Sequence, residues 1–419
     1  MGAHKAMHIV YVSQYFPPEV AAPAVRVYEL SRQWVRMGHK VTVLTGFPHH
    51  PTGVVPKNYR GYLRKFENCE GIRVIRTWLY AAPNVGVFRR SLCYLSFMIS
   101  AIITGLLYVR RPDVVIATSP QLLVGVAGWL IAKLKRCPFI FEVRDLWPEG
   151  IASVGVMGEN GILYRLLKMV ACWVYHKAHR IVVVTRSFIG EIGAVYGIEN
   201  SKIFFVPNGV DTDLFNPPNT SQKQKAREEF GFKPGFCVVY AGTIGPSQGL
   251  DSVLKGFQAA SIKGASLHFF GEGAAKEELI SQAKRMGMDN VFFHGFIPRQ
   301  QMPRLYWAAD CAVVSLQEGG VWDKVLPSKM FEIMACGCPL VGLLDGESAE
   351  VARGSGAALV VPRGDWKGFA NALRRLASDS SLKDTLSRAG ASFVCRRFDR
   401  KKLARSYLEF LVECAHATN

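Results

Sequence analysis

Short apolar runs recur along the chain, and most of them are followed by a stretch with helical periodicity. Each run has the length of a buried strand, and the alternation of strand and helix indicates a parallel sheet with helices on both faces. In the first half, helices are expected between the strands, among them 23–37, 91–109 and 162–177. The strands predicted there are 8–13, 40–45, 72–78, 114–118, 139–143, 180–185 and 202–206.

The pattern pauses and then begins again. Residues 211–233 are rich in Asn, Pro, Thr, Gln and Lys and contain few apolar residues, which is typical of a linker followed by a short helix. The strands predicted after this pause are 237–241, 267–270, 291–294, 312–315, 339–343 and 358–361, and two closing helices are predicted at 382–395 and 401–414. We therefore expect an α/β fold of two doubly wound, Rossmann-like domains that face each other across a cleft.

The length of the chain, 419 residues, also favours two domains. We predict a first domain over 1–211, a linker over 212–234 and a second domain over 235–395. The remaining residues, 396–419, are predicted to form a closing helix that packs back on the first domain.

The composition suits a globular protein with a polyanionic partner. The chain is 49% hydrophobic and 20% charged, and its formal net charge is +18. This excess favours a phosphorylated substrate, an anionic membrane or nucleic acid. No nucleic-acid-binding motif occurs, so nucleic acid is the least favoured partner. Among the ten cysteines only Cys336 and Cys338 lie close in sequence, so we expect reduced core cysteines of a cytoplasmic protein without a signal peptide.

One segment, residues 91–109, contains no charged residue and is long enough to span a bilayer. It lies between two predicted strands, and a helix that joins two strands of one sheet has to return to that sheet. Two other interpretations stay open. The helix could be buried under a neighbour, or it could lie in the membrane surface with its flanking arginines toward the headgroups, namely Arg89, Arg90, Arg110 and Arg111. In the second case the inserted side chains would be Phe88, Leu92, Tyr94 and Phe97.

Ligands of open parallel sheets bind at the carboxyl ends of the strands, so the loops after the strands are searched first. The loop 14–24 follows the first strand, and its small residues allow a ligand to approach a helix N-terminus, where free N–H groups favour a phosphate. The loop 141–149 (FEVRDLWPE) gathers charges at a strand end. Its Asp145 could act as a base toward a hydroxyl or align it. The alternative is an Arg144–Asp145 pair that only fixes the turn.

Two loops of the second half carry further candidates. The stretch 240–250 (YAGTIGPSQGL) places glycines between a strand and a helix and could hold a diphosphate on backbone amides, although this signal is weak by itself. In 325–339 (VLPSKMFEIMACGCP), Lys329 and Glu332 share one face of a helical turn, and Ser328 could cap its free amides. An ammonium there could neutralise phosphate, and a carboxylate could accept ribose hydroxyls. An exposed surface pair is the alternative, which the apolar neighbours disfavour.

Seven motifs occur in one order along the chain, namely FPPEVAAPAVR, VRDLWPE, VPNGVD, YAGTIGPSQGL, HFFGEG, FFHGFIP and PSKMFEIMACGCP. As an ordered set they resemble glycosyltransferase family four, retaining sugar-nucleotide transferases of the GT-B fold, along essentially the full length. The stretches QYFPPEVAAPAVR, TGFPHHPTG, RDLWPE and GTIGPSQGL are most similar to the bacterial O-antigen and capsule branch, which includes L-fucosamine (FucNAc) transferases.

The resemblance implies transfer of a sugar, expected to be an N-acetylated deoxyhexosamine such as L-FucNAc, from a UDP-sugar to a polyprenyl-diphosphate-linked acceptor. It implies no metal and no cofactor, and a peripheral position on the inner face of the cell membrane. The expected catalytic residues are Asp145, Lys329 and Glu332. The expected donor-binding residues are Gly242, Thr243, Gly245, Gln248, Gly273, Gly295, Phe296, Ile297, Lys324, Ser328, Lys329 and Glu332. The expected acceptor-binding residues are Pro18, Ala21, Ala22, His49, His50, Arg144 and Asp145; for the two histidines, a solvated loop pair is the alternative.

The chain departs from the family pattern at several of these positions. Glu332 matches the second acid of the family's Glu-x7-Glu motif, but Lys324 stands at the first. Thr243 and Gln248 stand where many members have basic residues, and Ala21-Ala22 replaces a glycine pair. We therefore expect Lys324 and Lys329 to supply the phosphate-neutralising charge. The Asp-x-Asp at 211–213 is read as an accidental match to a metal motif of another fold.

Two alternative functions stay open at this point. A UDP-sugar epimerase of the same fold would need acids and a histidine at the sugar and no apolar docking helix. A basic nucleic-acid-binding protein would explain the net charge of +18, and a salt-dependent gel shift would detect it.

Overall fold

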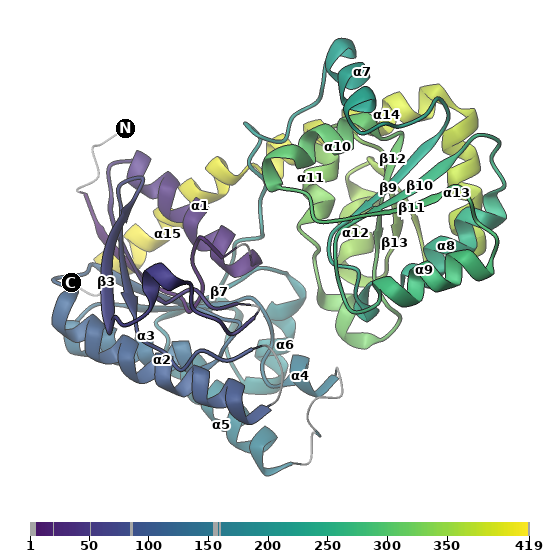
Figure 1. Ribbon diagram of the computed structural model, residues 1–419. Coiled ribbons are helices and arrows are strands. Elements are labelled where there is room, and N and C mark those ends of the chain that lie inside the picture. The colour runs from purple at the N-terminus through teal and green to yellow at the C-terminus, as the bar shows by residue number, and fades with distance from the viewer. Residues whose placement is uncertain are drawn as a thin grey trace. The chain divides into compact units, whose positions relative to one another are not determined.

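The computed structural model describes residues 6–417 except 20, 51, 84–86, 154–157 and 159–160. The chain divides into two compact units, each built around its own sheet (Figure 1). The first unit comprises Met1–Pro207 and Lys401–Asn419, and the second comprises Asn208–Arg400. Both are Rossmann-like α/β domains, as the alternation of strands and helices predicts.

The sheet of the first unit has the strand order β3-β4-β2-β1-β5-β6-β7-β8. All pairs are parallel except β3 and β4, which form an antiparallel hairpin at the edge. The strands are β1 His8–Val12, β2 Lys40–Gly46, β3 Arg64–Cys69, β4 Ile72–Thr77, β5 Val114–Thr118, β6 Phe139–Val143, β7 Arg180–Val183 and β8 Ile203–Phe205.

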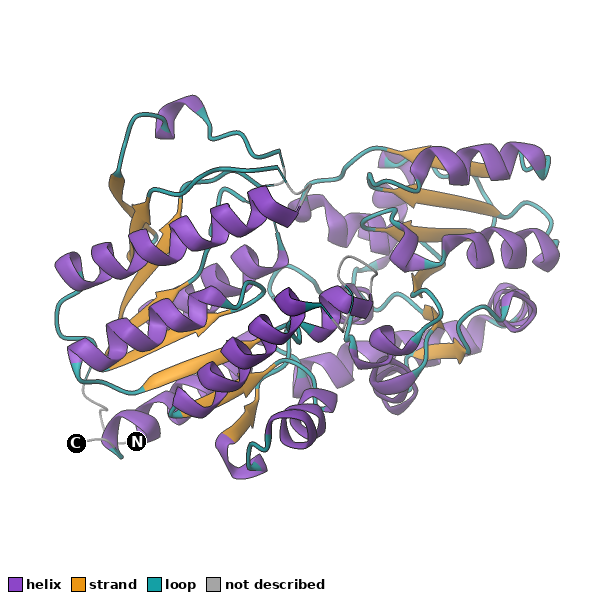
Figure 2. Cartoon of the chain, turned by 90° about the horizontal axis from the view of Figure 1, so that it is seen from below, coloured by secondary structure: helices purple, strands orange, loops and turns teal. Residues whose placement is uncertain are grey.

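Two layers of helices cover this sheet (Figures 1 and 2). One face carries α2 Val87–Tyr108, α3 Leu123–Lys135 and α5 Ile162–Lys177. The other face carries α1 Ala22–Arg36 and α15 Arg400–His416, which are joined by a hydrogen bond of 2.9 Å from the Trp34 indole to the carbonyl of Ala404. The end of the chain thus completes the core of the first unit. Two short helices, α4 Glu149–Ser153 and α6 Ser187–Tyr196, follow β6 and β7.

Helix α2 contains the apolar segment 91–109 and connects β4 to β5 of the same sheet. Its inner face, with Cys93, Phe97 and Ala101, is buried in the core, whereas its outer face is uncovered. The interpretation of simple burial under a neighbour is therefore wrong. The expected insertion of Phe97 is also wrong, because this side chain is 0% exposed. Within the described residues, Phe88–Tyr108 is the one stretch whose length and composition would suffice to cross a membrane.

The second unit contains a sheet of the order β11-β10-β9-β12-β13-β14, in which all pairs are parallel. Its strands are β9 Cys237–Ala241, β10 Ser266–Phe270, β11 Val291–His294, β12 Cys311–Ser315, β13 Leu340–Leu343 and β14 Ala358–Val361. Its helices are α7 Thr220–Glu229, α8 Leu250–Ala260, α9 Lys276–Arg285, α10 Met302–Ala308, α11 Lys329–Ala335, α12 Gly346–Gly354, α13 Trp366–Ser378 and α14 Ser380–Arg397.

Residues 212–234 belong to the second unit instead of forming a linker. They contain α7, which begins with a capping box at Asn219 and buries Ala226 in the core. Arg227 of this helix forms an ion pair of 2.9 Å with Asp310. The short helix expected in this segment is present, but its buried Ala226 and the ion pair of Arg227 attach it to the second unit.

The order of each sheet defines where a ligand is expected. In the first unit the chain continues from β1 to β2 on one side, and β5 lies on the other. In the second unit β9 lies between β10 and β12 in the same way. At such a switch point the loops diverge and leave room at the carboxyl ends of the strands. The loops after β1 and β9 follow the two central strands, and the site is built from these loops and their neighbours.

Candidate active site

In the second unit, Lys329 at the start of α11 lies against the loop after β9. Its Nζ donates a hydrogen bond to the Tyr240 hydroxyl at 3.0 Å and lies 4.2 Å from the centroid of that ring. A Cβ on Gly242 would lie 2.9 Å from the same Nζ, so a glycine allows this approach. Burial lowers the pKa of Lys329 to about 8, although Glu332 opposes this shift. The cation therefore touches the glycine loop directly.

Tyr240 connects Lys329 to the glycine loop. Its hydroxyl donates to the carbonyl of Thr243 at 2.7 Å and lies 3.3 Å from Oε1 of Gln248. Tyr240 is not expected at a site from the sequence, since a tyrosine inside a strand is usually a core residue. Its position in YAGTIG, immediately before the loop, is the signal that could have found it. Thr243 is exposed and Gln248 is half-buried, so both are accessible from the loop.

Glu332 forms its ion pair with Arg299 and not with Lys329. Arg299 Nη1 donates to Glu332 Oε1 at 2.9 Å, and the Glu332 side chain is only 13% exposed. Burial raises the pKa of Glu332, and Arg299 opposes that shift. The interpretation as an exposed Lys–Glu pair is therefore wrong. Arg299 follows the FFHGFIP motif directly and also lies over the ring of Phe215 at 5.2 Å; no spacing in the sequence connects it to Glu332.

The glycine loops of the second unit pack backbone against backbone. The amide of Gly242 donates to the carbonyl of Phe270 at 2.9 Å, and the amide of Gly271 donates to the carbonyl of Gly295 at 3.1 Å. A Cβ on Gly273, whose φ is +158°, would lie 2.2 Å from the carbonyl oxygen of Ile244. The motif HFFGEG thus supports the loop after β9. Of the remaining donor-binding candidates, Gly245 is buried, Gly295 and Phe296 are exposed, and Ile297 is half-buried.

Lys324 ends the short helix η5, Gly320–Lys324, and is half-buried. Arg363, which no motif in the sequence indicates, holds the chain around this helix. It donates to the carbonyls of Gln317 at 3.0 Å and Gly319 at 2.9 Å, and it pairs with Asp323 and with Asp345. Arg363 is therefore a positioning residue for the segment that carries Lys324.

The predicted cap of α11 is not formed. Ser328 is exposed, adopts helical backbone angles and makes no side-chain capping hydrogen bond. A cap residue accepts such a bond from an extended backbone, which Ser328 does not have. Its hydroxyl is consequently not engaged by the helix start.

In the first unit, Glu142 belongs to the core, which corrects its assignment to the cluster of charges at the end of β6. It is fully buried and accepts hydrogen bonds from Tyr11 at 2.7 Å, Thr118 at 2.8 Å and Arg26 at 2.9 Å. Burial acts to raise the pKa of Glu142, but Arg26 holds it below its usual range. Glu149 is likewise engaged, since it accepts from the Tyr196 hydroxyl at 2.6 Å.

Asp145 and Arg144 remain available after Glu142 and Glu149 are assigned to the structure. Asp145 is exposed, and Arg144 is half-buried. No ion pair joins them, so the alternative in which this pair only fixes the turn is wrong. The Ser119 hydroxyl instead accepts from the amide of Arg144 at 2.8 Å. Nε and Nη1 of Arg144 are shielded from solvent and have no hydrogen-bond partner among the described residues, so this guanidinium can still bind a ligand.

His49 and His50 follow β2 and are held by Glu19. The carboxylate of Glu19 accepts from the amides of His49 at 3.0 Å and His50 at 2.9 Å. The Tyr15 ring lies 5.9 Å from the His49 ring and 5.4 Å from the His50 ring. His49 is 5% exposed, so the solvated-loop alternative is wrong for it, whereas His50 is half-buried. Burial lowers the pKa of both histidines, which favours neutral rings at pH 7.

The start of α2 adjoins the same loops. Cys93 Sγ lies 3.5 Å from His49 Nε2. One turn away, Arg90 donates to the Tyr94 hydroxyl at 3.0 Å, and the Tyr94 ring packs edge-on against Trp147 at 6.0 Å. The apolar helix is therefore continuous with the candidate acceptor loops, which the sequence pattern did not indicate.

The remaining acceptor candidates lie at the start of α1. Pro18 and Ala22 are exposed and Ala21 is half-buried. Ala21 provides no side-chain cap and the first turn contains no acid, so the amides there are open to an anion. Within the part of the chain that the structure describes, no group of three or more His, Cys, Asp or Glu side chains could hold a metal ion.

Comparison with known proteins identifies the reaction class. Residues 21–209 match the family described as "Glycosyl transferase 4-like domain", and residues 222–393 match "Glycosyl transferases group 1". The chain is a glycosyltransferase of this family 4/group 1 type. The two matches correspond to the two structural units, and the second contains the glycine loops together with Lys329 and Glu332.

Relatives of this glycosyltransferase are found in bacteria. The chain is 25% identical over 336 residues to "Putative colanic acid biosynthesis glycosyl transferase WcaI" of Escherichia coli, which covers 79% of this chain and 82% of the relative. It is 26% identical over 245 residues to "Probable glycosyltransferase WbjE" of Pseudomonas aeruginosa. That match covers 58% of this chain and 60% of the relative. The family thus includes relatives in polysaccharide biosynthesis.

Solved structures show that the enzyme has the GT-B fold. HepE of Anabaena, determined in complex with UDP, superposes with a TM-score of 0.73 at 16% identity and covers 97% of this chain and 100% of that one. Sucrose-phosphate synthase of Thermosynechococcus elongatus superposes with a TM-score of 0.77 at 19% identity and covers 98% and 100%. At these identities the likeness concerns the fold alone.

Proposed function

We propose that this glycosyltransferase moves a sugar from a UDP-sugar to a polyprenyl-diphosphate-linked acceptor in O-antigen or capsule biosynthesis. The transfer retains the anomeric configuration and requires no metal, and the sugar is an N-acetylated deoxyhexosamine such as L-FucNAc. Two comparisons support parts of this proposal. A relative carries a name from colanic acid biosynthesis, and HepE was determined with UDP and with UDP-glucose.

The observation that carries the proposal is the contact between Lys329, Tyr240 and the glycine loop. A diphosphate bound at the loop after β9 would meet the Lys329 ammonium, and no carboxylate forms an ion pair with that ammonium among the described residues. Glu332, fixed by Arg299, would accept the ribose hydroxyls. Lys324 would add a second cation. These residues form a donor site in the second unit that supplies positive charge from side chains.

The chemistry follows from these positions. The bond between the anomeric carbon and the β-phosphate oxygen breaks, and its electron pair stays on that oxygen. Lys329 stabilises the resulting charge inside a partly buried site, where such stabilisation is strong. The acceptor hydroxyl approaches on the same face, forms the new bond and passes its proton to the departing phosphate oxygen, which retains the configuration.

The first unit would bind the acceptor. Asp145 is exposed at the carboxyl end of β6 and would align the acceptor hydroxyl. Arg144 and His50 would contact the acceptor sugar or its phosphate. The uncovered outer face of α2, which begins beside these loops, would hold the enzyme on the cytoplasmic face of the membrane, where a lipid-linked acceptor is found.

A donor and acceptor panel tests this function. Purified enzyme is assayed with UDP-sugars and GDP-sugars against polyprenyl-diphosphate sugars, in the presence and absence of EDTA, and the product anomer is determined by NMR. Transfer from a UDP-sugar with retained configuration and full activity in EDTA is expected. Preference for GDP-sugars, an inverted product or loss of activity in EDTA would each overturn the corresponding part of the proposal.

A further inference from the structure

The apolar outer face of α2 continues over the neighbouring helices of the same layer. Along α2, Leu95, Ile99, Ile103 and Leu107 are exposed at helical spacing. On α5, Ile162 is 86% exposed, Leu166 is 54% exposed and Met169 is 69% exposed. At the end of α3, Leu134 is 55% exposed. Helices α2, α3 and α5 lie side by side on one face of the sheet (Figures 1 and 2), so these side chains form one surface, here called the apolar face.

The charged side chains on the three helices of the apolar face have one sign. Helices α2, α3 and α5 contain no aspartate or glutamate. Their cations are Arg89, Arg90, Lys133, Lys135, Arg165, Lys168 and Lys177. The helices on the opposite face of the sheet carry acids, namely Glu29 in α1 and Glu409 and Glu413 in α15. Helices whose exposed side chains are apolar and basic, without acids, complement an anionic bilayer, which offers acyl chains and negative headgroups together.

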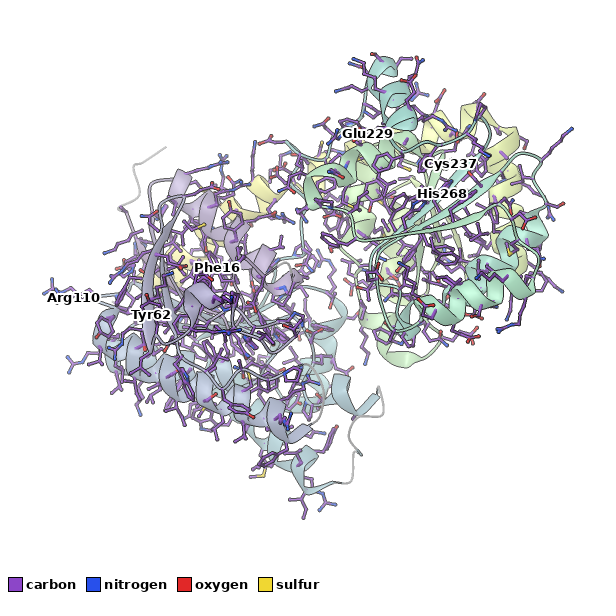
Figure 3. The ribbon with its side chains drawn as sticks, in the orientation of Figure 1. Phe16, Tyr62, Arg110, Glu229, Cys237 and His268 are labelled. Atoms are coloured by element: carbon purple, nitrogen blue, oxygen red, sulfur yellow. The ribbon has the colours of Figure 1, made fainter. Side chains whose placement is uncertain are left out.

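A basic hollow lies at the edge of the apolar face, where α2 and α3 end. Its volume is about 590 Å³, and it is lined by Arg110, Arg111, Leu134, Lys135 and Arg136. Figure 3 shows Arg110 extending outward from the first unit. Lys135 Nζ donates to the carbonyl of Leu106 at 2.7 Å and so joins the two helix ends. Among the described residues, none of these cations forms an ion pair.

The hollow lies where the chain turns after α2 and after α3. Arg111 has φ +45° and Arg136 has φ +57°, the left-handed region that glycine or asparagine normally occupies. At Arg136 this conformation ends α3, because the amides of Arg136 and Cys137 donate to the carbonyls of Lys133 at 3.3 Å and Ala132 at 3.1 Å. The nearest acid in sequence, Asp113, is engaged by the amide of His8 at 2.6 Å. The hollow therefore gathers four cations without a compensating carboxylate.

We propose that the apolar face and the basic hollow together bind an anionic phospholipid bilayer, with the phosphate of one headgroup in the hollow. This inference rests on the membrane position in the proposed function and extends it from one helix to three. Helix α2 has 22 residues and is about 33 Å long, and because its inner face packs in the core of the first unit it would lie along the bilayer surface. Its start would hold the acceptor loops at the surface, and its end would be fixed by the bound headgroup.

Vesicle binding tests the hollow with a charge-matched control. The hollow variant is Arg110→Gln/Arg111→Gln/Arg136→Gln. The control, Lys223→Gln/Lys225→Gln/Lys263→Gln, removes three exposed cations of the second unit. Cosedimentation uses vesicles of phosphatidylcholine with and without phosphatidylglycerol. The hollow variant should lose about fivefold in affinity per removed cation for the anionic vesicles, and the control should lose much less. Equal losses in the two variants would overturn the headgroup site.

A second variant tests the contribution of α5. Ile162→Ser/Leu166→Ser/Met169→Ser changes three exposed side chains, so its melting temperature should equal that of the wild type. It should bind both kinds of vesicle at least tenfold more weakly, since each of these side chains would lose its place in the acyl region. Unchanged vesicle binding would overturn the three-helix surface. A wild-type dimer that this variant dissociates, measured by light scattering, would assign the face to a second copy and also overturn it.

Two further measurements separate the alternatives. Millimolar inorganic phosphate should not displace the wild-type protein from anionic vesicles; displacement would show that the hollow binds a soluble anion. All variants should keep full transfer to a short-chain acceptor in detergent-free buffer. If the wild-type protein binds vesicles but transfers no sugar to any acceptor, the proposed function fails and the docking surface stands. If it transfers sugar but does not bind anionic vesicles, the docking surface fails alone.

Discussion

The ammonium of Lys329 lies 3.0 Å from the hydroxyl of Tyr240, and that hydroxyl donates onward to the backbone of the glycine loop at Thr243. A lysine at the start of α11 is thus attached to a loop that lies almost ninety residues earlier in the chain. Burial lowers the pKa of Lys329 to about 8, so this cation is poorly compensated in the free protein. An anion bound at the loop would restore the compensation, which makes the proton of Lys329 a reporter of diphosphate binding.

The affinity for UDP should depend on pH through Lys329. Below pH 8 the ammonium is charged with and without ligand, so binding takes up no proton. Above pH 8 the free protein has lost that proton and must regain it when diphosphate binds, so affinity should fall about tenfold per pH unit. Calorimetry in buffers of different ionisation enthalpy measures the uptake. Uridine, which has the same base without phosphate, and Lys329→Gln are the controls; absence of proton uptake in the wild type would contradict the assignment.

Glu332→Gln should weaken the binding of UDP and of uridine alike, because the proposed partner of this carboxylate is the ribose. The loss of a charged acceptor costs about 1.5–3 kcal/mol, roughly a tenfold to hundredfold loss of affinity. Isothermal calorimetry measures both ligands. Since Glu332 also pairs with Arg299 at 2.9 Å, the double variant with Arg299→Gln shows whether the effect acts through the arginine. Loss of affinity for UDP with uridine unaffected would contradict the ribose contact and show that Glu332 acts through the neighbouring cations Arg299 and Lys329.

Asp145→Asn should abolish transfer and leave UDP affinity nearly unchanged, because Asp145 is exposed in the first unit and the proposed donor residues lie in the second. Glu142→Gln, three residues earlier, is the matched contrast. It breaks a buried pair with Arg26 and should destabilise the protein by about 3–5 kcal/mol. Steady-state transfer assays and denaturant unfolding separate the two effects. A parallel loss of UDP binding in Asp145→Asn would show that the acceptor assignment is wrong.

These two acids illustrate what the sequence can and cannot reveal. Both stand in FEVRDLWPE at the end of one strand, and a strand end is a reasonable place to expect charges that serve a site. Glu142 is buried and paired with Arg26, which lies 116 residues earlier in the chain. No local pattern encodes a contact of that separation. Arg299 and Glu332, 33 residues apart, pose the same problem. Local pattern therefore predicts where charges gather in the sequence, whereas the pairing of those charges depends on the tertiary structure.

The helices and strands were more predictable from the sequence than the side-chain pairs. Helix α5, Ile162–Lys177, has the bounds expected from its periodicity, and most parallel strands are short apolar runs whose bounds differ from the prediction by one or two residues. Strand β3 was missed because it is a half-exposed edge strand with a charged sequence, RKFENC. Its turn, Glu70-Gly71, has positive φ at both residues, as a two-residue hairpin requires, but glutamate is an unusual first residue there.

Substitutions on the two sides of α2 should have different effects. Ile99→Ser/Ile103→Ser/Leu107→Ser changes the exposed side of the helix and should preserve stability, increase solubility and preserve transfer to short-chain acceptors. Transfer to long-chain polyprenyl acceptors on vesicles should fall sharply, since the enzyme no longer stays at the surface. Phe97→Ser, on the inner side of the same helix, should instead destabilise the protein by about 3–5 kcal/mol, because it empties a fully buried position.

Salt should partly release the wild-type protein from membranes, as ionic attraction to headgroups is screened. Equal loss on both acceptor types in the outer variant would mean that α2 supports the fold or the acceptor site directly, and resistance of the wild type to both high salt and alkaline carbonate would mean that the helix inserts across the bilayer.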